Sequence, residues 1–193
     1  LQPFLFAMEV AIAELWAHWG VHPDAVIGQS MGEVAAAHVA GILSLDDAAR
    51  IICRRSRLLL SVRGRGAMAV INLDAAATRA AIADHLDSLA VAAISGPMST
   101  VVSGDPGAVD AVVARLKSDG VFARKVKVDV ASHSPQMDPL KDELRAEVAT
   151  VTAREATTAI ISTVTGQPAT GLEYGPEYWV DNLREPVALW PGV

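Results

Sequence analysis

The sequence predicts an α/β protein in which a smaller unit is inserted into a larger body that contains a parallel sheet. Two observations support this fold class. A short apolar run, Ala25 to Ile27, precedes Gly28-Gln29-Ser30-Met31-Gly32 and an alanine-rich stretch, an order that predicts strand, sharp turn and helix. The middle third of the chain follows the order β-α-β-β-α-β, which is the ferredoxin-like arrangement.

Residues 1–65 are expected to form the first part of the body. The segment Phe4 to Trp19 is apolar but contains two glutamates, so it predicts an amphipathic helix rather than a membrane span. After the strand and turn around Ser30, Ser44 followed by two aspartates predicts the start of a helix that continues to Leu60. A break rich in glycine and arginine then ends this part.

Residues 66–128 are expected to form the inserted unit. Asp74 and Asp105 are typical helix N-caps, and Gly96-Pro97 predicts a turn between two strands. In chain order, the expected elements are a strand at Ala67–Leu73, a helix to His85, strands at Leu89–Ser95 and Thr100–Ser103, a helix to Lys117 and a strand at Val121–Val128.

Residues 129–193 are expected to return to the larger body. The hydrophobic pattern predicts a helix at Pro135–Val148, a buried strand at Ala159–Val164 and a short helix at Tyr178–Leu183. No internal repeat interrupts this organisation.

The composition indicates a globular protein, because 51% of the 193 residues are apolar and only 20% are charged. A formal net charge of -6 without a dominant basic run argues against a nucleic-acid partner. The single cysteine, Cys53, excludes an internal disulfide framework and favours a reducing, cytoplasmic compartment. We expect no metal site.

Ser30 is the candidate nucleophile. A serine at the apex of such a turn is exposed, lies at a helix N-terminus and has glycines on both sides that relieve crowding. This pattern is typical of covalent acyl chemistry. The same five residues also occur as an ordinary strand-to-helix turn, so the pattern alone leaves both interpretations open.

His133 is the candidate base, which a serine nucleophile needs because its hydroxyl is not ionised at neutral pH. The residue follows the last strand of the inserted unit, where the chain re-enters the body and where loops line clefts. Its position alone leaves a catalytic and a non-catalytic role equally open. Non-catalytic roles are favoured for the other histidines: His18, His22, His38 and His85.

Four stretches, in order, resemble the motifs of one enzyme family. They are an elbow at Val26–Gly41, an arginine motif at Cys53–Arg57, a histidine motif at Val130–Ser134 and an N-L-R-x-P-V stretch within Trp179–Val187. Together they resemble the acyltransferase domains of modular (type I) polyketide synthases, in the malonyl/methylmalonyl-coenzyme A:acyl carrier protein transacylase family. The resemblance covers nearly the whole chain and implies a hydrolase-like α/β body with a ferredoxin-like insertion.

The resemblance implies an acyltransferase that moves an extender unit from coenzyme A to the phosphopantetheine arm of an acyl carrier protein, in polyketide or branched-lipid biosynthesis. In this mechanism Ser30 forms the acyl-enzyme, His133 transfers protons and the backbone N–H of Met31 stabilises the oxyanion. Motif alignment assigns to Asn182 the backbone carbonyl that orients the histidine. No bound cofactor is implied, since acyl-coenzyme A is the substrate and the phosphopantetheine belongs to the carrier.

Substrate selection is assigned by the same resemblance. Arg55 matches the arginine that pairs with the free carboxylate of a malonyl-type group; without the family match, it would be interpreted as part of a solvated helix face. A small Ser132, where malonyl-selective relatives have phenylalanine, leaves room for an α-methyl group. Methylmalonyl is therefore favoured over malonyl and ethylmalonyl. The residues expected to tune this choice are Gln29, Met31, Val130 and Ser132.

The chain also departs from the family pattern. Gln29 replaces the usual histidine, and the N-terminal G-Q-G-x-Q loop that supplies a second oxyanion donor has no counterpart. We therefore expect an internal piece of one acyltransferase domain, in a longer synthase with ketosynthase, linker and carrier domains. Two alternatives stay open: a G-x-S-x-G or editing acyl hydrolase, which would share Ser30 and His133 without needing Arg55, and a non-catalytic structural or docking module.

Overall fold

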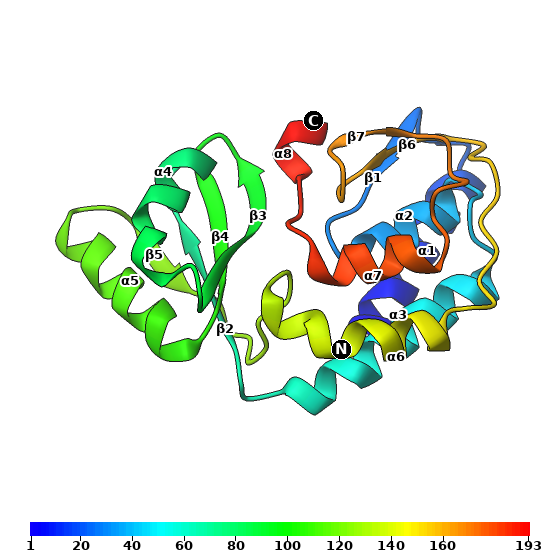
Figure 1. Ribbon diagram of the computed structural model, residues 1–193. Coiled ribbons are helices and arrows are strands. Elements are labelled where there is room, and N and C mark those ends of the chain that lie inside the picture. The colour runs from blue at the N-terminus through cyan, green and yellow to red at the C-terminus, as the bar shows by residue number, and fades with distance from the viewer.

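In the computed structural model, which describes residues 1–193, the chain forms two parts that have separate sheets and separate hydrophobic cores (Figure 1). The larger part contains a three-stranded sheet in the order β1-β6-β7. β1 (Ala25–Ile27) and β6 (Ala159–Ser162) are parallel, while β7 (Gln167–Ala169) is antiparallel to β6. The predicted α/β class is confirmed, but only one pair of strands in this mixed sheet is parallel.

The larger part also contains six α-helices. They are α1 (Gln2–His18), α2 (Gly32–Val39), α3 (Leu45–Leu59), α6 (Lys141–Glu147), α7 (Pro176–Arg184) and α8 (Leu189–Gly192). All of them except α8 contribute to a core of 24 buried residues, in which Ile51, Leu144 and Trp179 are completely buried or nearly so. None of the helices combines the length and apolar character that spanning a membrane requires.

The smaller part has a four-stranded antiparallel sheet in the order β3-β4-β2-β5. Its elements are β2 (Ala67–Ile71), α4 (Ala75–Ala81), β3 (Leu89–Gly96), β4 (Ser99–Gly104), α5 (Pro106–Ser118) and β5 (Ala123–Lys125). This is the order of strands and helices that the sequence predicts. The two helices cover the sheet face that points away from the larger part (Figure 1). The core of the smaller part, with 12 buried residues, lies between these helices and the sheet.

The predicted N-caps lie where the helices begin. Ser44 Oγ accepts a hydrogen bond from the Asp47 N–H at 3.1 Å at the start of α3. Asp74 and Asp105 cap α4 and α5 in the same way, at 2.7 and 2.9 Å. These side chains satisfy backbone donors that the first turn of a helix leaves free, which fixes where each helix starts.

Five elements differ from the prediction. The helix expected to reach His85 is α4, which ends at Ala81, followed by a 3₁₀ segment at Ala83–His85. The expected helix at Pro135–Val148 is a 3₁₀ segment, Pro135–Leu140, followed by α6, because Pro139 has no N–H to donate to an α-helical bond. β5 covers only Ala123–Lys125 of the eight residues expected. β7 and α8 were not predicted; both are very short, and each contains a proline that obscures its pattern.

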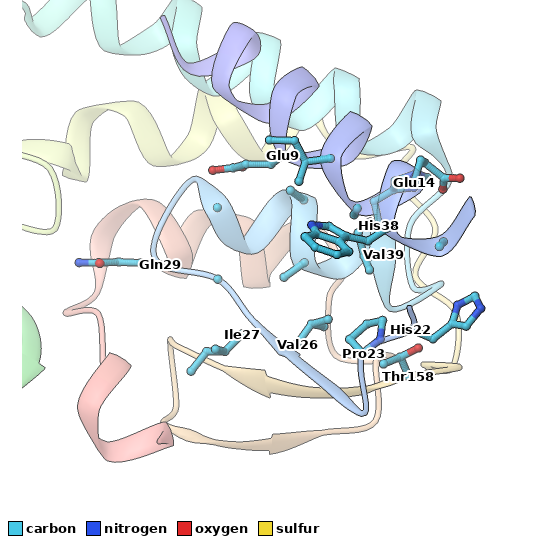
Figure 2. Close-up of a pocket in the computed structure, with 18 of the residues that line it drawn as sticks. Glu9, Glu14, His22, Pro23, Val26, Ile27, Gln29, His38, Val39 and Thr158 are labelled. Carbon is cyan, nitrogen blue, oxygen red and sulfur yellow. The ribbon is translucent and has the colours of Figure 1, made fainter. Parts of the chain in front are cut away.

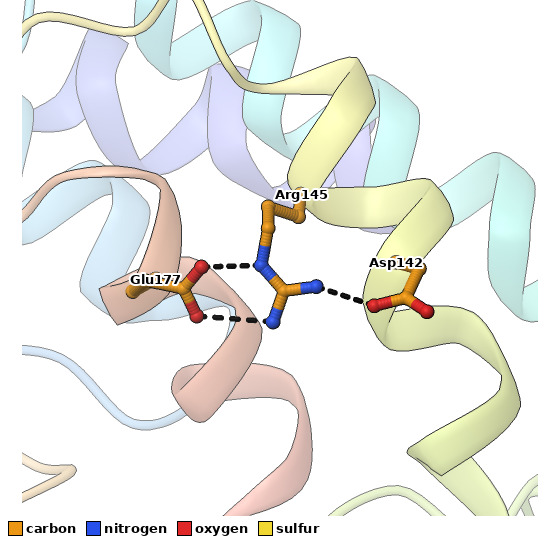
Figure 3. Close-up of polar contacts among 3 residues, drawn as sticks. All are labelled: Asp142, Arg145 and Glu177. Atoms are coloured by element: carbon orange, nitrogen blue, oxygen red, sulfur yellow. Dashed lines mark hydrogen bonds and ion pairs between the residues drawn. The ribbon is translucent and has the colours of Figure 1, made fainter.

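Helices α6 and α7 are joined at the surface by Arg145. Its guanidinium contacts Glu177 of α7 through two nitrogens and Asp142 of α6 through a third (Figure 3). Exposed ion pairs of this kind contribute little to stability. The contact nevertheless links the helix that follows the histidine motif to α7, whose C-terminal end faces the candidate site.

The residues between α7 and α8 connect the two parts of the molecule. The Val187 N–H donates to the Ala92 carbonyl at 2.9 Å and the Val187 carbonyl accepts from the Ile94 N–H at 2.8 Å, so this residue pairs with β3. The next residue donates back to the larger part, from the Ala188 N–H to the Thr163 carbonyl at 2.6 Å. We call residues 185–188 the connecting segment.

Candidate active site

The turn between β1 and α2 holds Ser30 in an unusual backbone conformation. Its φ is 55°, in the left-handed region that non-glycine residues rarely adopt. Gly28 is required by close packing, since a Cβ there would lie 2.3 Å from the Gly32 carbonyl oxygen. Gly32 has room for a side chain, because the nearest heavy atom to its Cβ position is 3.7 Å away. Only one of the two glycines therefore relieves crowding, in contrast to the prediction.

Ser30 and His133 are adjacent although 103 residues separate them in the sequence. Ser30 Oγ lies 2.7 Å from His133 Nε2. On the other side of the ring, His133 Nδ1 lies 2.9 Å from the Glu185 carbonyl oxygen, which can only accept a hydrogen bond. The proton of the neutral ring is therefore on Nδ1, and Nε2 is free to accept the hydroxyl proton of Ser30.

The prediction that the Asn182 carbonyl orients the histidine is wrong, because Glu185 supplies that carbonyl. The reason is the end of α7. Asn182 lies inside the last turn of the helix, whereas Glu185 is the C-cap and has extended dihedral angles, φ -79° and ψ 156°. Its carbonyl consequently turns away from the helix axis and toward the ring. The His133 N–H also donates to the Leu183 carbonyl at 3.2 Å.

Arg55 is buried beside the candidate nucleophile, and one of its N–H groups has no hydrogen-bond partner. It lies on the apolar face of α3, in the same stripe as Ile51, Ile52 and Leu58, and is only 2% exposed. Nη2 donates to Ser30 Oγ at 2.8 Å and Nη1 donates to Gln2 Oε1 at 3.1 Å. Nε has no hydrogen-bond partner, and no carboxylate forms an ion pair with the guanidinium.

The other arginines of the motif differ from Arg55. Arg54 pairs with Glu147 on the surface at 3.1 Å, and Arg57 is exposed. Arg55 is therefore a buried cation without a carboxylate partner in the chain, a costly arrangement that makes it a candidate anion-binding residue.

Burial and charge set the protonation states at this site. Burial lowers the pKa of Arg55 to about 10, which leaves the guanidinium protonated at neutral pH. Burial, together with the positive charge of Arg55, lowers the pKa of His133 to about 4, against a raising effect of the hydrogen bond to Glu185. The histidine is therefore neutral at pH 7 and has the protonation state that a general base needs.

A small cavity opens beside Ser30 and His133, between the two parts of the molecule. Its volume is about 260 Å³. It is lined by Gln29, Ser30, Ser132, His133 and Val187 from the larger part, and by Met68, Ala93 and Val101 from the sheet of the smaller part. Gln29 and Ser132, two of the expected specificity residues, line this cavity, whereas Met31 and Val130 do not.

A larger cavity of about 990 Å³ lies on the other side of the turn, among α1, β1 and α2. It is mostly apolar and includes Met31, but neither Ser30 nor His133 lines it. Gln29 borders both cavities, and Figure 2 shows its side chain extending away from the other labelled residues of the larger one. The chemistry of the site belongs to the smaller cavity because the reactive groups are there.

Comparisons with known proteins agree with this geometry. A family model described as acyl transferase domain matches residues 1–193. The chain belongs to this family. It is 46% identical over 187 residues to erythronolide synthase EryA2 of Saccharopolyspora erythraea, covering 97% of this acyltransferase chain and 5% of that protein. The resemblance to acyltransferase domains of modular polyketide synthases is thereby confirmed.

Two solved structures extend the comparison. The acyltransferase domain from module 8 of the salinomycin polyketide synthase has a TM-score of 0.94 and 44% identity, over 95% of this chain and 44% of that chain. The malonyl CoA-acyl carrier protein transacylase of Coxiella burnetii has a TM-score of 0.90 and 28% identity, over 97% of this chain and 62% of that chain. The acyltransferase chain thus spans less than two thirds of either structure's length.

Some residues at the site of this acyltransferase domain cannot be predicted from its sequence. Glu185 lies in the C-terminal motif, but the exit of the chain from α7 was needed to choose it over Asn182. Glu33 is buried in the first turn of α2, and its only signal in the sequence is a carboxylate among the alanines of a buried helix. The apolar residues contributed by the smaller part could not be identified, because nothing in an alternating strand marks which side chain faces a neighbouring unit.

Proposed function

We propose that this chain loads a malonyl-type extender unit from coenzyme A onto the phosphopantetheine arm of an acyl carrier protein, through an ester of Ser30. Methylmalonyl is favoured over malonyl and ethylmalonyl. The observation that carries the proposal is the buried guanidinium of Arg55, which donates to the nucleophile at 2.8 Å and has no anionic partner. A substrate that brings both a thioester and a free carboxylate supplies what this pair of residues lacks.

In the first half of the reaction, neutral His133 accepts the hydroxyl proton of Ser30 at Nε2 as Oγ attacks the thioester carbonyl carbon. The carbonyl oxygen becomes an oxyanion, and the backbone N–H of Met31, which makes no hydrogen bond within the chain, stabilises it at the N-terminal end of α2. The C–S bond then breaks. The thiolate of coenzyme A leaves with the proton that His133 returns, and the acyl group stays on Ser30.

The second half runs through the same groups in reverse. The phosphopantetheine thiol loses its proton to His133 Nε2 and attacks the ester carbonyl, and the Ser30 oxygen leaves with that proton. The Glu185 carbonyl stabilises the imidazolium that forms in each half, because it accepts a hydrogen bond from Nδ1.

Arg55 selects for the carboxylate. A guanidinium binds a carboxylate through two parallel hydrogen bonds, and the free Nε and the two donor nitrogens of Arg55 can provide them. An acetyl group would leave the buried cation unpaired, which disfavours plain acyl thioesters. The choice among malonyl-type groups then depends on Ser132, whose small side chain leaves space in a cavity of about 260 Å³.

The same proposal covers the organisation of the chain. We propose a large subdomain made of residues 1–65 and 129–193 and a ferredoxin-like small subdomain at 66–128, supported by the two separate cores and the β3-β4-β2-β5 strand order. The domain is placed within a cytoplasmic multidomain synthase, next to ketosynthase and linker domains. A carrier protein domain is its partner, and no nucleic acid is involved.

The test is to mix the protein with methylmalonyl-, malonyl-, ethylmalonyl- or acetyl-coenzyme A and to search for acylated Ser30 by peptide mass spectrometry, with Ser30→Ala as the control. We expect malonyl-type groups on Ser30 and no acetyl group. Addition of a carrier protein should move the acyl group to its thiol faster than water releases it. Release to water alone would indicate a hydrolase, acetylation alone would refute the role of Arg55, and no acyl-serine from a folded protein would refute the transferase.

A further inference from the structure

Glu33 lies three residues after the nucleophile, in the first turn of α2, and its side chain is completely buried. Its carboxylate accepts hydrogen bonds from two segments distant in the sequence. The Thr163 N–H lies 3.0 Å and the Thr163 hydroxyl 2.6 Å from a carboxylate oxygen of Glu33. The Asn182 side-chain amide donates to the carboxylate at 2.9 Å and the Tyr174 hydroxyl at 3.2 Å. The Tyr178 hydroxyl is a further donor to it. Burial raises the pKa of Glu33, while the hydrogen bonds from Thr163, Tyr178 and Tyr174 oppose the rise.

Two of these partners also hold the backbone of the nucleophile turn. The Asn182 Nδ2 group has two hydrogens: one is directed to Glu33 and the other to the Ser30 carbonyl oxygen at 3.2 Å. The Thr163 N–H donates to Glu33, and the single hydrogen of the Thr163 hydroxyl is shared between Glu33 Oε2 at 2.6 Å and the Gly28 carbonyl oxygen at 2.9 Å. One buried carboxylate thus positions the two side chains that contact the carbonyl of Ser30 and the carbonyl of Gly28, two residues before it.

The contact with the Ser30 carbonyl also determines where the oxyanion donor points. The carbonyl of Ser30 and the N–H of Met31 belong to one planar trans peptide group, in which they face opposite directions. Fixing the oxygen toward Asn182 therefore directs the Met31 N–H to the other side of the turn. The Glu33 N–H strengthens this arrangement, because it donates to the same carbonyl at 3.1 Å.

We propose that Glu33 is a positioning residue for the nucleophile: it fixes Asn182 and Thr163 on the Ser30 and Gly28 carbonyls, and so holds Ser30 in its left-handed conformation with the Met31 N–H directed at the oxyanion. A φ of 55° persists at a serine only where the surroundings enforce it. The inference rests on Ser30 being the nucleophile of the proposed function. The side chains of Asn182 and Thr163 make no hydrogen bond to His133 or Arg55, so the contacts that carry this role are those to the turn.

The experiment compares variants that remove a contact to the turn with variants that do not. Asn182→Leu removes the amide, and Thr163→Val removes the hydroxyl, whereas Thr163→Ser keeps it. Glu33→Gln replaces one of the two acceptor oxygens with an NH2 donor, so the side chain can no longer accept from the Asn182 amide and from the Thr163 N–H at the same time. Tyr174→Phe is the matched control, because it removes a hydrogen bond to the same carboxylate but leaves both carbonyl contacts intact.

Three quantities are measured for each variant: the maximal rate of Ser30 acylation by methylmalonyl-coenzyme A, the dissociation constant of the thioester, and the rate of labelling by a fluorophosphonate. Thermal unfolding monitors the fold. We expect Asn182→Leu and Glu33→Gln to lower the maximal rate and the labelling rate by about tenfold or more, since small misplacements of reacting groups are costly. Thioester affinity should be unchanged, and Tyr174→Phe and Thr163→Ser should react like the wild type.

A merely structural role predicts another outcome. Rates that fall in Tyr174→Phe as much as in Asn182→Leu, in proportion to the loss of melting temperature, would overturn the proposal, as would a loss of thioester affinity at an unchanged maximal rate. If Glu33→Gln does not fold, the pair Thr163→Val and Thr163→Ser decides. Fluorophosphonate labelling separates this test from the proposed function, because it reports on the nucleophile whatever thioester the protein accepts.

Discussion

The two parts of the molecule contribute to the small cavity in different ways. The larger part provides the proposed nucleophile and base, Ser30 and His133, whose side chains lie 2.7 Å apart. Arg55, which does not itself line the cavity, donates to Ser30 Oγ at 2.8 Å from behind. The smaller part provides only apolar side chains, from Met68, Ala93 and Val101. Chemistry and shape are therefore separated, and substitutions in the two parts should affect different kinetic parameters.

Loss of the nucleophile should have the largest effect. Ser30→Ala removes the only atom that can form the acyl-enzyme, so we expect acyl transfer to fall on the order of 10⁴-fold or more. Transfer of radiolabelled methylmalonyl to a carrier protein measures it, with thermal unfolding to verify the fold. A normal transfer rate in this variant would mean that Ser30 is not the nucleophile and that the reactive groups do not lie in the larger part at this turn.

Removal of the buried cation should have the next largest effect. Arg55→Ala should lower kcat/KM for methylmalonyl-coenzyme A by about a hundredfold, because the substrate carboxylate loses its charged partner. The discrimination against acetyl-coenzyme A should fall by a similar factor. Arg55→Lys is the matched control: it keeps the charge but not the two-point geometry, so we expect an intermediate value. Equal losses for both thioesters would contradict the assigned role.

The pH dependence should sharpen the electrostatic side of the comparison. His133 with a pKa of about 4 remains a base down to about pH 5, so the acylation rate should be flat from pH 8 to 5 and fall below that. In Arg55→Ala the fall in rate should begin at a higher pH, since the positive charge of Arg55 helps to lower the pKa of His133. An unchanged limb in that variant would indicate that burial alone sets the pKa.

The same shift has a consequence for stability. The pKa of the histidine is lower in the folded than in the unfolded chain, where it is 6.5, so the unfolded chain binds the proton more readily. The free energy of unfolding is therefore unaffected by this titration above about pH 6.5, and it decreases progressively as the pH falls toward 4. A His133→Gln variant should show a weaker decline of the melting temperature over this interval than the wild type.

Substitution in the smaller part should have the smallest effect on rate. Val101→Ala enlarges the cavity without touching a reactive group, so kcat for methylmalonyl should change by less than about tenfold, while ethylmalonyl should improve relative to it. Competition between the two thioesters, read by mass spectrometry of acylated Ser30, measures the ratio. A large loss of kcat without a change in this ratio would show that the smaller part also supports the chemistry.

Most of the fold could be predicted because its signals are local. Ser44, Asp74 and Asp105 mark three helix starts by side-chain caps, and the turn around Ser30 is marked by spacing. The orientation of the histidine could not be predicted this way. It depends on how the chain leaves α7 at Glu185, and no residue type signals that carbonyl. Similarly, Val130 is close in sequence to the site, but the backbone turn after it places Ser132 rather than Val130 at the cavity.

The connecting segment limits how far the smaller part, which shapes the cavity, can be replaced without disturbing the proposed reactive groups of the larger part. Within four residues, the Glu185 carbonyl holds the histidine ring and Val187 pairs with a strand of the smaller part. A chimera that grafts the smaller part of a relative onto this larger part must therefore reproduce the backbone register at Ala92 and Ile94. A graft that shifts this register will twist the segment and rotate the imidazole, so a swap made to change the extender unit would be penalised as a loss of turnover.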